Sequence, residues 1–226
     1  RPETRDPRPQ TPDPRPRPET PDPRPETPDP GLAYTARVVE RTVASREVFA
    51  GRLLHVRVDD VELDGGKTAT REIVEHPGAV AILAFTAQRE LVLVKQYRKA
   101  AERFTVEIPA GTLGAGEEPR ACAIRELKEE TGFAAGTLDS VCSFYTAVGF
   151  CTEVLHLFVA EGLQAGEQAC EEDEDIEIMT VPVPAAMEMV RDGSIVDSKT
   201  VAGVFWAELF VAGNPRALQL RQGRAA

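Results

Sequence analysis

The first 30 residues limit most strongly what this chain can fold into, because they hold twelve of its 18 prolines. They run through degenerate copies of a seven-residue unit, RPETPDP in its most complete form, with no apolar side chain other than proline. Such a segment cannot bury enough surface to offset the conformational entropy that ordering would cost. We therefore expect residues 1–30 to be a disordered, extended tail.

The rest of the chain is long enough for one substantial core with a small appended subdomain. The formal net charge is −11. Almost all of it lies after residue 30, because within residues 1–30 six Arg nearly balance seven Asp and Glu. A body this acidic argues against nucleic acid as a partner and favours a protein that gathers cations. No run of about 18 apolar residues is present, so we expect no membrane partner.

The cysteines give the expected compartment. Cys122, Cys142, Cys151 and Cys170 are spread along the chain without CxxC spacing. Because no export signal precedes them, we expect free thiols in a reducing compartment, and hence a cytoplasmic location.

Residues 31–76 are expected to form a small antiparallel β subdomain, followed by a second domain over residues 77–226. Alternating, β-branched stretches predict its strands at residues 35–43, 51–63 and 68–75. A hairpin turn is expected at Asp64-Gly65-Gly66.

The second domain is expected to mix strands and helices. Its strands are predicted at residues 78–85, 90–96, 105–108, 137–146 and 154–160, and its helices at 117–131, 184–191 and 198–211. An acidic loop is expected over residues 168–177. This order predicts an α/β or α+β sandwich with helices packed on a mixed sheet.

One face of the helix expected at residues 117–131 carries three carboxylates. Glu126, Glu129 and Glu130 stand at positions i, i+3 and i+4, so they share one side of the helix. Carboxylates this close repel one another, and a hard divalent cation that prefers oxygen ligands would relieve the repulsion. The alternative is a solvated acidic face that binds nothing.

The residues around this helix resemble the Nudix signature without gaps. The matching positions are Gly111, Glu117, Arg125, Glu126, Leu127, Glu129, Glu130, Gly132 and Phe133. Further segments are similar to the branch that contains ADP-ribose and nucleotide-sugar pyrophosphatases: residues 71–78, 96–98, 107–111, 172–177 and 192–200. The resemblance implies a Nudix α/β/α sandwich and magnesium-dependent hydrolysis of a pyrophosphate.

The resemblance also implies a metal site. Glu126 and Glu130 are expected to bind Mg²⁺, with Mn²⁺ as a substitute, and Glu129 to share or bridge the ion. The carbonyl oxygen of Ala110 is a further expected ligand, and Arg125 is expected to orient the glutamates.

Substrate-binding residues carry over in the same way. Arg98 is expected to pair with a substrate phosphate, Arg71 and Glu72 to reach the nucleoside, and Glu107 and Arg52 to join them. The alternatives are a surface arginine at a strand end for Arg98 and a surface ion pair for Arg71 and Glu72.

The resemblance also implies a general base in the acidic loop after the last sheet strands. Glu172 and Glu174 are the matching positions, and Glu153 is a third candidate. The alternatives are a flexible acidic loop without a role for the first two and a solvated acid at a strand start for Glu153. The box position Glu117 is expected to help hold its loop rather than to take a proton.

Two departures affect the expected substrate. Relatives that act on ADP-ribose usually carry prolines where this chain has Thr146 and Val148, and an aromatic side chain where it has Arg52. Hydrolysis of ADP-ribose to AMP and ribose 5-phosphate is the leading hypothesis, with a nucleotide sugar or a dinucleotide as alternative substrates. A non-catalytic ligand-binding module is a third hypothesis, and members of this branch are expected to be homodimers.

Overall fold

The computed structural model describes residues 40–169 and 175–211, which all belong to one compact unit, Val38–Ala226. The proline-rich tail expected at residues 1–30 lies outside the described residues, and so do the candidate bases Glu172 and Glu174. None of the described helices is long and apolar enough to cross a membrane.

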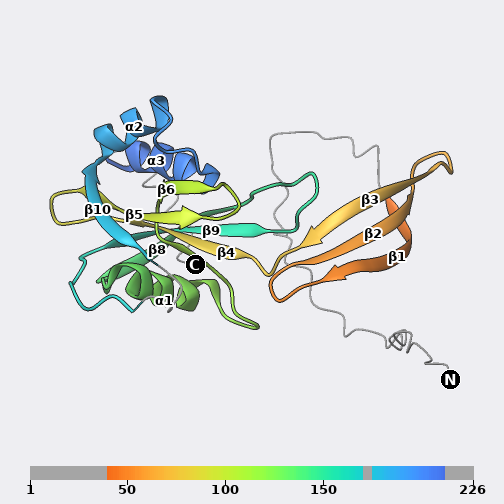
Figure 1. Cartoon of the computed structure of the whole chain (residues 1–226), viewed down its shortest axis with the longest axis horizontal. Helices are drawn as coiled ribbons and strands as arrows, with labels where there is room; N and C mark the ends of the chain where they lie inside the picture. Colours follow the sequence, from red (N-terminus) through yellow and green to blue (C-terminus); the bar gives the residue numbers. More distant parts are fainter. Residues whose placement is uncertain (1–39, 170–174, 212–226) are drawn as a thin grey trace, which may run out of the picture. The chain divides into compact units, whose positions relative to one another are not determined.

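A three-stranded antiparallel sheet opens the described part of the chain (Figure 1). Its strands are β1 (Arg41–Ala50), β2 (His55–Glu62) and β3 (Thr68–Glu75), in that order across the sheet. The expected turn between β2 and β3 is present, and within it the Gly66 N–H donates to the Leu63 carbonyl at 3.1 Å. The predicted N-terminal antiparallel sheet is thereby confirmed.

Strand β1 runs further along the chain than the sequence predicts. The pattern favours a strand at residues 35–43, but β1 continues to Ala50 and stays paired with β2. The pairing passes through two irregularities, one between Thr42 and Ala44 and one between Glu47 and Phe49. Such bulges change which side chains share a face, so the strict alternation that identifies a strand is lost.

The residues after β3 form a mixed four-stranded sheet. It has the order β7-β4-β9-β8, with bounds β4 (Ala79–Ala84), β7 (Ala110–Thr112), β8 (Thr137–Tyr145) and β9 (Val154–Glu161). Strand β4 is parallel to β9 and antiparallel to β7. Every residue of β4 is buried, which is typical of a continuous apolar run at the centre of a sheet.

A second sheet has the order β10-β5-β6, with β5 (Glu90–Arg98), β6 (Arg103–Glu107) and β10 (Glu177–Pro182). The sequence does not predict β10, because its residues directly follow an acidic stretch and include only a short apolar run. It lies at the edge of the sheet, antiparallel to β5, and tertiary pairing rather than local pattern makes it a strand.

Helices cover both sides of the sheets. Figure 1 shows α1 (Pro119–Thr131) on one side, and α2 (Val183–Arg191) with α3 (Ser198–Val211) on the other. Helix α3 occupies the residues that the sequence predicts for it. The α/β/α layering implied by the Nudix resemblance is therefore confirmed.

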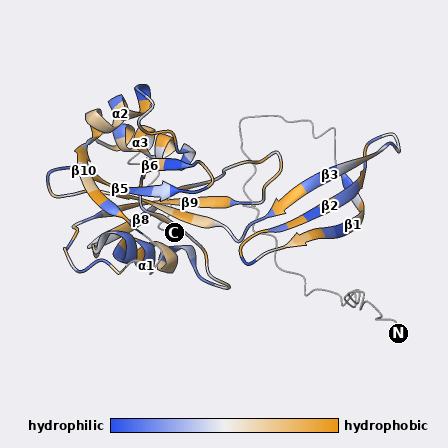
Figure 2. Cartoon of the chain, viewed as in Figure 1, coloured by the Kyte–Doolittle hydropathy of each residue, from blue (hydrophilic) through white to orange (hydrophobic). Residues whose placement is uncertain are grey.

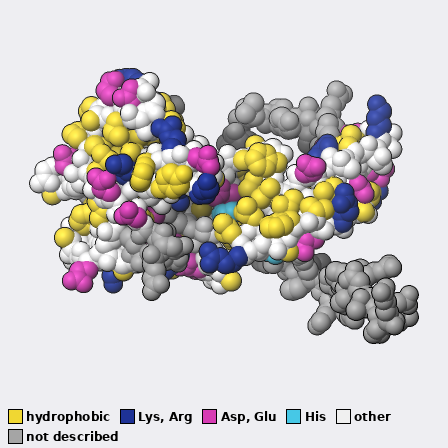
Figure 3. All heavy atoms as spheres, in the orientation of Figure 1, with side chains coloured by type: hydrophobic (Ala, Val, Ile, Leu, Met, Phe, Trp, Pro, Cys, Tyr) yellow, Lys and Arg dark blue, Asp and Glu magenta, His cyan; other side chains and the backbone are white. Residues whose placement is uncertain are grey.

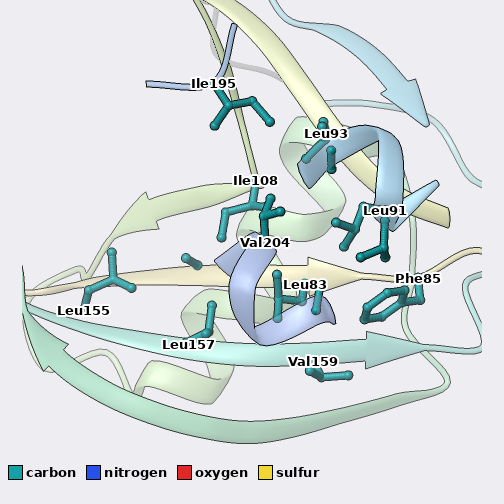
Figure 4. Packing of buried hydrophobic residues seen from close by; sticks show 14 of the residues in the cluster. Leu83, Phe85, Leu91, Leu93, Ile108, Leu155, Leu157, Val159, Ile195 and Val204 are labelled. Carbon is teal, nitrogen blue, oxygen red and sulfur yellow. The ribbon is translucent and has the colours of Figure 1, made fainter. Parts of the chain in front are cut away.

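Alternate side chains of β4 enter two separate cores. Leu83 packs in a cluster that includes Leu93 of β5 and Val204 of α3 (Figure 4). Ile82, the preceding residue, packs in a second cluster with Leu127 of α1. Figure 2 shows hydrophobic residues along β4 and β9, which lie between these two cores. The central sheet thus fixes α1 and α3 at set positions on opposite faces.

Candidate active site

Helix α1 has well-defined ends that fix its glutamates. Pro119 occupies the first turn, where its missing N–H leaves no helical hydrogen bond unmade. Gly132 ends the helix in the left-handed region with φ 71°, and its N–H donates to the Lys128 carbonyl at 2.8 Å. A side chain at Gly132 would lie 2.7 Å from the Gly166 carbonyl oxygen, so the following loop approaches closely only because this residue is glycine.

Glu126, Glu129 and Glu130 of α1 all line one pocket. Glu130 is almost fully buried, with 4% of its surface exposed, whereas the side chains of Glu126 and Glu129 are 13% and 38% exposed. The acidic face of α1 is therefore largely enclosed, in contrast to a solvated helix surface.

Arg125 holds the carboxylates of this face. Its Nη1 donates to Glu126 at 2.7 Å and to Glu129 at 2.9 Å. Its Nε and Nη2 both donate to Glu117 at 2.9 Å, so the guanidinium ties the helix to the loop before it. The hydrogen bonds that Arg125 donates to Glu117 raise the pKa of Arg125. The same bonds, with the one donated by the Gly114 N–H, lower the pKa of Glu117 to about 2.

Strand β7 presents its backbone to these glutamates. The Ala110 N–H donates to Glu130 at 3.0 Å. A side chain on Gly111 would lie 1.8 Å from the carboxyl carbon of Glu126, so that carboxylate occupies the space a β-carbon would fill. This closeness requires glycine at position 111.

The donor set suits a hard divalent cation. The carboxylates of Glu126, Glu129 and Glu130 line the pocket, and Mg²⁺ or Ca²⁺ prefers such oxygen ligands. Within residues 40–169 and 175–211, no three His, Cys, Asp or Glu side chains converge as a ready-made cage. Arg125 and the Ala110 N–H hydrogen-bond oxygens of these carboxylates, so a cation that binds there would replace some of those contacts.

A second charged network lies on another wall of the pocket, around Glu107 of β6. Arg98 donates to its two oxygens from Nε at 2.8 Å and from Nη2 at 2.7 Å. Thr105 donates to the same carboxylate at 2.6 Å, and Lys199 of α3 also donates to it. Burial alone would raise the pKa of Glu107, but the hydrogen bonds from Arg98, Lys199 and Thr105 bring it to about 2.

The pocket between these networks has a volume of about 690 Å³, within the range of sites for small-molecule ligands. Its walls come from the β1–β2 turn, the strands β4, β5, β7 and β9, helix α1 and the start of α3. Among the residues that the structure describes, four glutamates contribute to the lining: Glu126, Glu129, Glu130 and Glu153. Arg52, Arg98, Arg125 and Lys199 are the basic residues that line it.

The residues expected to bind substrate divide into two groups. Arg98 and Arg52 line the pocket, Arg52 from the turn between β1 and β2. Glu107 lies behind Arg98, with only 2% of its surface exposed. Arg71 and Glu72 do not line this pocket, and Arg71 instead donates to Glu40 at 2.9 Å on the N-terminal sheet.

Of the three candidate bases, the structure describes only Glu153. It lines the pocket near the start of β9 and accepts a hydrogen bond from the Thr146 hydroxyl. Its carboxylate also lies 3.5 Å from Nδ1 of His76.

Several pocket residues carry no predicted role, namely Leu53, Thr146, Asp197, Ser198 and Lys199. The stretch from Asp197 to Thr200 is only a point of resemblance in the sequence. Its place in the pocket depends on how α3 packs against β6, which no local pattern reveals.

Comparison with known families divides most of the described chain into two adjoining domains. Residues 75–201 match the NUDIX domain, and residues 40–74 match the nucleoside diphosphate sugar hydrolase N-terminal domain. The fold is similar to that in a crystal structure of ADP compounds hydrolase, with a TM-score of 0.70 and 24% identity. That likeness covers 78% of this chain and 96% of the other.

Two curated relatives are each 45% identical to this chain over 172 residues, which is 75% of this chain and 93% of the relative. They are the methanol dehydrogenase activator of Bacillus methanolicus and the ADP-ribose pyrophosphatase of Bacillus subtilis (strain 168). A GDP-mannose pyrophosphatase of Cronobacter sakazakii is 36% identical over 141 residues, 58% of this chain and 73% of the relative.

An acidic helix face and an anchored arginine on different walls of one pocket are typical of a hydrolase that acts on a phosphate-bearing substrate. The chain belongs to the Nudix family of hydrolases, whose members generally work with a divalent metal ion.

Proposed function

We propose that this protein hydrolyses the pyrophosphate bond of a nucleoside-diphosphate-linked compound, with ADP-ribose, cut to AMP and ribose 5-phosphate, as the leading substrate. One observation carries the proposal: the enclosed glutamates of α1 and the anchored guanidinium of Arg98 line the same pocket. The ADP-ribose pyrophosphatase of Bacillus subtilis, 45% identical to this chain, supports the choice of substrate.

The proposed cofactor is Mg²⁺, with Mn²⁺ as a substitute. Glu126, Glu129, Glu130 and the carbonyl oxygen of Ala110 would hold it, because they offer oxygen ligands at the pocket wall. A bound divalent ion supplies neutralisation of the pyrophosphate oxygens and activation of water.

The protein's own side chains bind, orient and move a proton. Arg98 donates to a substrate phosphate from Nη1, the guanidinium nitrogen that its pair with Glu107 leaves over. Arg125 keeps Glu126 and Glu129 in place on α1. A glutamate takes the proton of the attacking water, a step that typically contributes about 10²–10⁴-fold.

Glu172 and Glu174 are the proposed positions for that base, carried over from the family resemblance. Glu153 is the third candidate, and its place in the pocket supports a role as the base.

A nucleotide sugar is the second candidate substrate. Arg52 lines the pocket where relatives that act on ADP-ribose usually have an aromatic side chain, and the relative from Cronobacter sakazakii is a GDP-mannose pyrophosphatase. An arginine plane can stack on a base or donate to its edge, so the base preference differs from that of an aromatic side chain. A non-catalytic binding module is the least favoured candidate, because the signature keeps every glutamate.

We also propose that the protein is a homodimer. Val43, Val48 and Phe49 of β1 are 48%, 48% and 57% exposed, and Figure 3 shows hydrophobic side chains gathered over the β1–β3 sheet. An apolar surface of this kind suits burial against a second copy. Light scattering on the purified protein measures its mass directly, and a monomer at micromolar concentration would overturn the proposed dimer.

The proposed location is the cytoplasm. Cys122 and Cys151 are free thiols, which supports this location.

The deciding experiment is a hydrolysis panel in Mg²⁺ with ADP-ribose, UDP-glucose, GDP-mannose, NADH and diadenosine polyphosphates, run beside a Glu130→Gln variant. We expect ADP-ribose to be cut fastest and the variant to be inactive. If a nucleotide sugar is cut fastest, the chemistry stands and the substrate is wrong. If the folded wild-type protein cuts nothing, the binding-module hypothesis replaces hydrolysis.

A further inference from the structure

Lys199 shares the buried carboxylate of Glu107 with Arg98. Nη2 of Arg98 and Nζ of Lys199 both donate to Oε2 of Glu107, while Nε of Arg98 and the Thr105 hydroxyl donate to Oε1. Each carboxylate oxygen therefore has two donors. The Glu107 side chain is 3% exposed and that of Lys199 is 14% exposed, so water has little access to replace either contact.

A closed set of contacts holds Lys199 in this position. Its Nζ also pairs with Oδ2 of Asp197 at 3.0 Å. The same oxygen accepts the Thr200 N–H at 3.0 Å and the Thr200 hydroxyl at 2.6 Å. The Thr200 oxygen in turn accepts the N–H of Ile108, the residue next to Glu107, at 3.0 Å. The start of α3 is thus bonded to the end of β6 at two adjacent residues.

The charges of this network balance. Arg98 and Lys199 carry two positive charges, and Glu107 and Asp197 carry two negative charges. Without Lys199, the network would carry a net negative charge in a pocket that several other glutamates already line. Glu107 would then draw Arg98 more strongly, and a substrate phosphate would be repelled.

We propose that Lys199 is a positioning residue, which holds Glu107 jointly with Arg98 so that Nη1 of Arg98 stays available to a phosphate of the substrate. The ammonium group of Lys199 already donates to the carboxylates of Glu107 and Asp197, so Lys199 acts through Arg98 rather than on the substrate. The proposal rests on the proposed function, since it requires a phosphate-bearing substrate in this pocket.

A double-mutant cycle between Lys199 and Arg98 tests this dependence. Lys199→Met, Arg98→Met and the double variant are compared with wild type for KM and kcat on ADP-ribose. We expect Lys199→Met to raise KM about tenfold in the wild-type background but less than about twofold beside Arg98→Met, because the residue acts through Arg98. The kcat of Lys199→Met should stay within about threefold, since the contact positions a binding group.

Lys95→Met is the matched control. Lys95 pairs with Glu177 at 3.1 Å on the exposed part of the β10-β5 pair and does not line the pocket. We expect its KM to equal that of wild type. Circular dichroism and thermal unfolding check that each variant is folded, and Lys199→Gln, which keeps a donor without the charge, replaces Lys199→Met in the cycle if the latter does not fold.

The outcomes are distinct. Additive KM effects, or an unchanged KM in Lys199→Met, overturn the positioning role and leave the proposed function intact. Wild-type protein that neither cuts ADP-ribose nor binds it in calorimetry overturns the proposed function for this substrate, and the positioning role with it.

Discussion

On the α1 side of the pocket one guanidinium holds three carboxylates, whereas on the β6 side one carboxylate holds two cations. Arg125 contacts Glu117, Glu126 and Glu129, and Glu107 contacts Arg98 and Lys199. The α1 side keeps surplus negative charge, which a bound cation would neutralise. On the β6 side Asp197 pairs with Lys199, so the two positive and two negative groups of this network cancel. Arg98 can therefore face an anion without repulsion from a net negative charge beside it. The two networks thus prepare different walls of one pocket for a metal ion and for a phosphate.

Removing a carboxylate from the acidic side should have the largest effect. We expect Glu126→Gln to lower kcat for ADP-ribose about 10³-fold, because the amide is a poor ligand for a hard divalent ion. AMP release measured by chromatography gives the rate. Glu102→Gln is the matched control, since Glu102 pairs with the exposed Lys99 on a surface turn. A Glu126→Gln rate within threefold of wild type would break the assignment of this side to the metal.

Removing the central charge of the other side should act mainly on stability. We expect Glu107→Gln to lower the free energy of unfolding by about 3 kcal/mol, because two cations are left against a buried neutral group. Urea unfolding followed by circular dichroism measures the change. The same control, Glu102→Gln, should stay within about 0.5 kcal/mol of wild type. Equal stabilities of Glu107→Gln and wild type would show that this network is not a buried charge centre.

Acid should reveal the same charge in the wild-type protein. The folded pKa of Glu107 is about 2, below its usual value, because the contacts from Arg98, Lys199 and Thr105 outweigh the cost of burial. The resulting stability is fully present above about pH 4.5 and is lost as pH falls toward 2. We therefore expect the stability gap between wild type and Glu107→Gln to narrow from pH 6 to pH 3. A gap that stays constant with pH would contradict the depressed pKa.

The smallest expected effect comes from a single methyl group. Gly111→Ala places a β-carbon 1.8 Å from the carboxyl carbon of Glu126, so that side chain must move. We expect kcat to fall about tenfold, since a displacement of this size misaligns catalytic groups. Gly149→Ala is the control, because a β-carbon there meets nothing within 4 Å. Matching rates for the two variants would show that Glu126 tolerates displacement.

The features that are visible in the sequence are those that local spacing encodes. The face shared by Glu126, Glu129 and Glu130 follows from helical periodicity, and α3 follows from a continuous apolar stretch. The contact between Lys199 and Glu107 joins residues 92 positions apart, so it becomes visible only when α3 is packed against β6. Strand β10 is not predicted from the sequence for a related reason, since it forms through its antiparallel pairing with β5. Arg71 matches a family position in sequence. Within this chain it pairs with Glu40 and does not line the pocket, so its role at the nucleoside stays a prediction.

The most direct test of the two-sided pocket is a Mg²⁺ titration of ADP-ribose hydrolysis in wild type, Glu129→Gln and Arg98→Met. Glu129 is the most exposed of the three pocket glutamates on α1, so its variant should keep measurable activity. We predict that Glu129→Gln raises the half-saturating Mg²⁺ concentration about tenfold with little change in KM for ADP-ribose. We predict that Arg98→Met instead raises KM for ADP-ribose about tenfold with little change in the half-saturating Mg²⁺ concentration. If both variants shift the two constants alike, the separation into a metal side and a phosphate side is wrong.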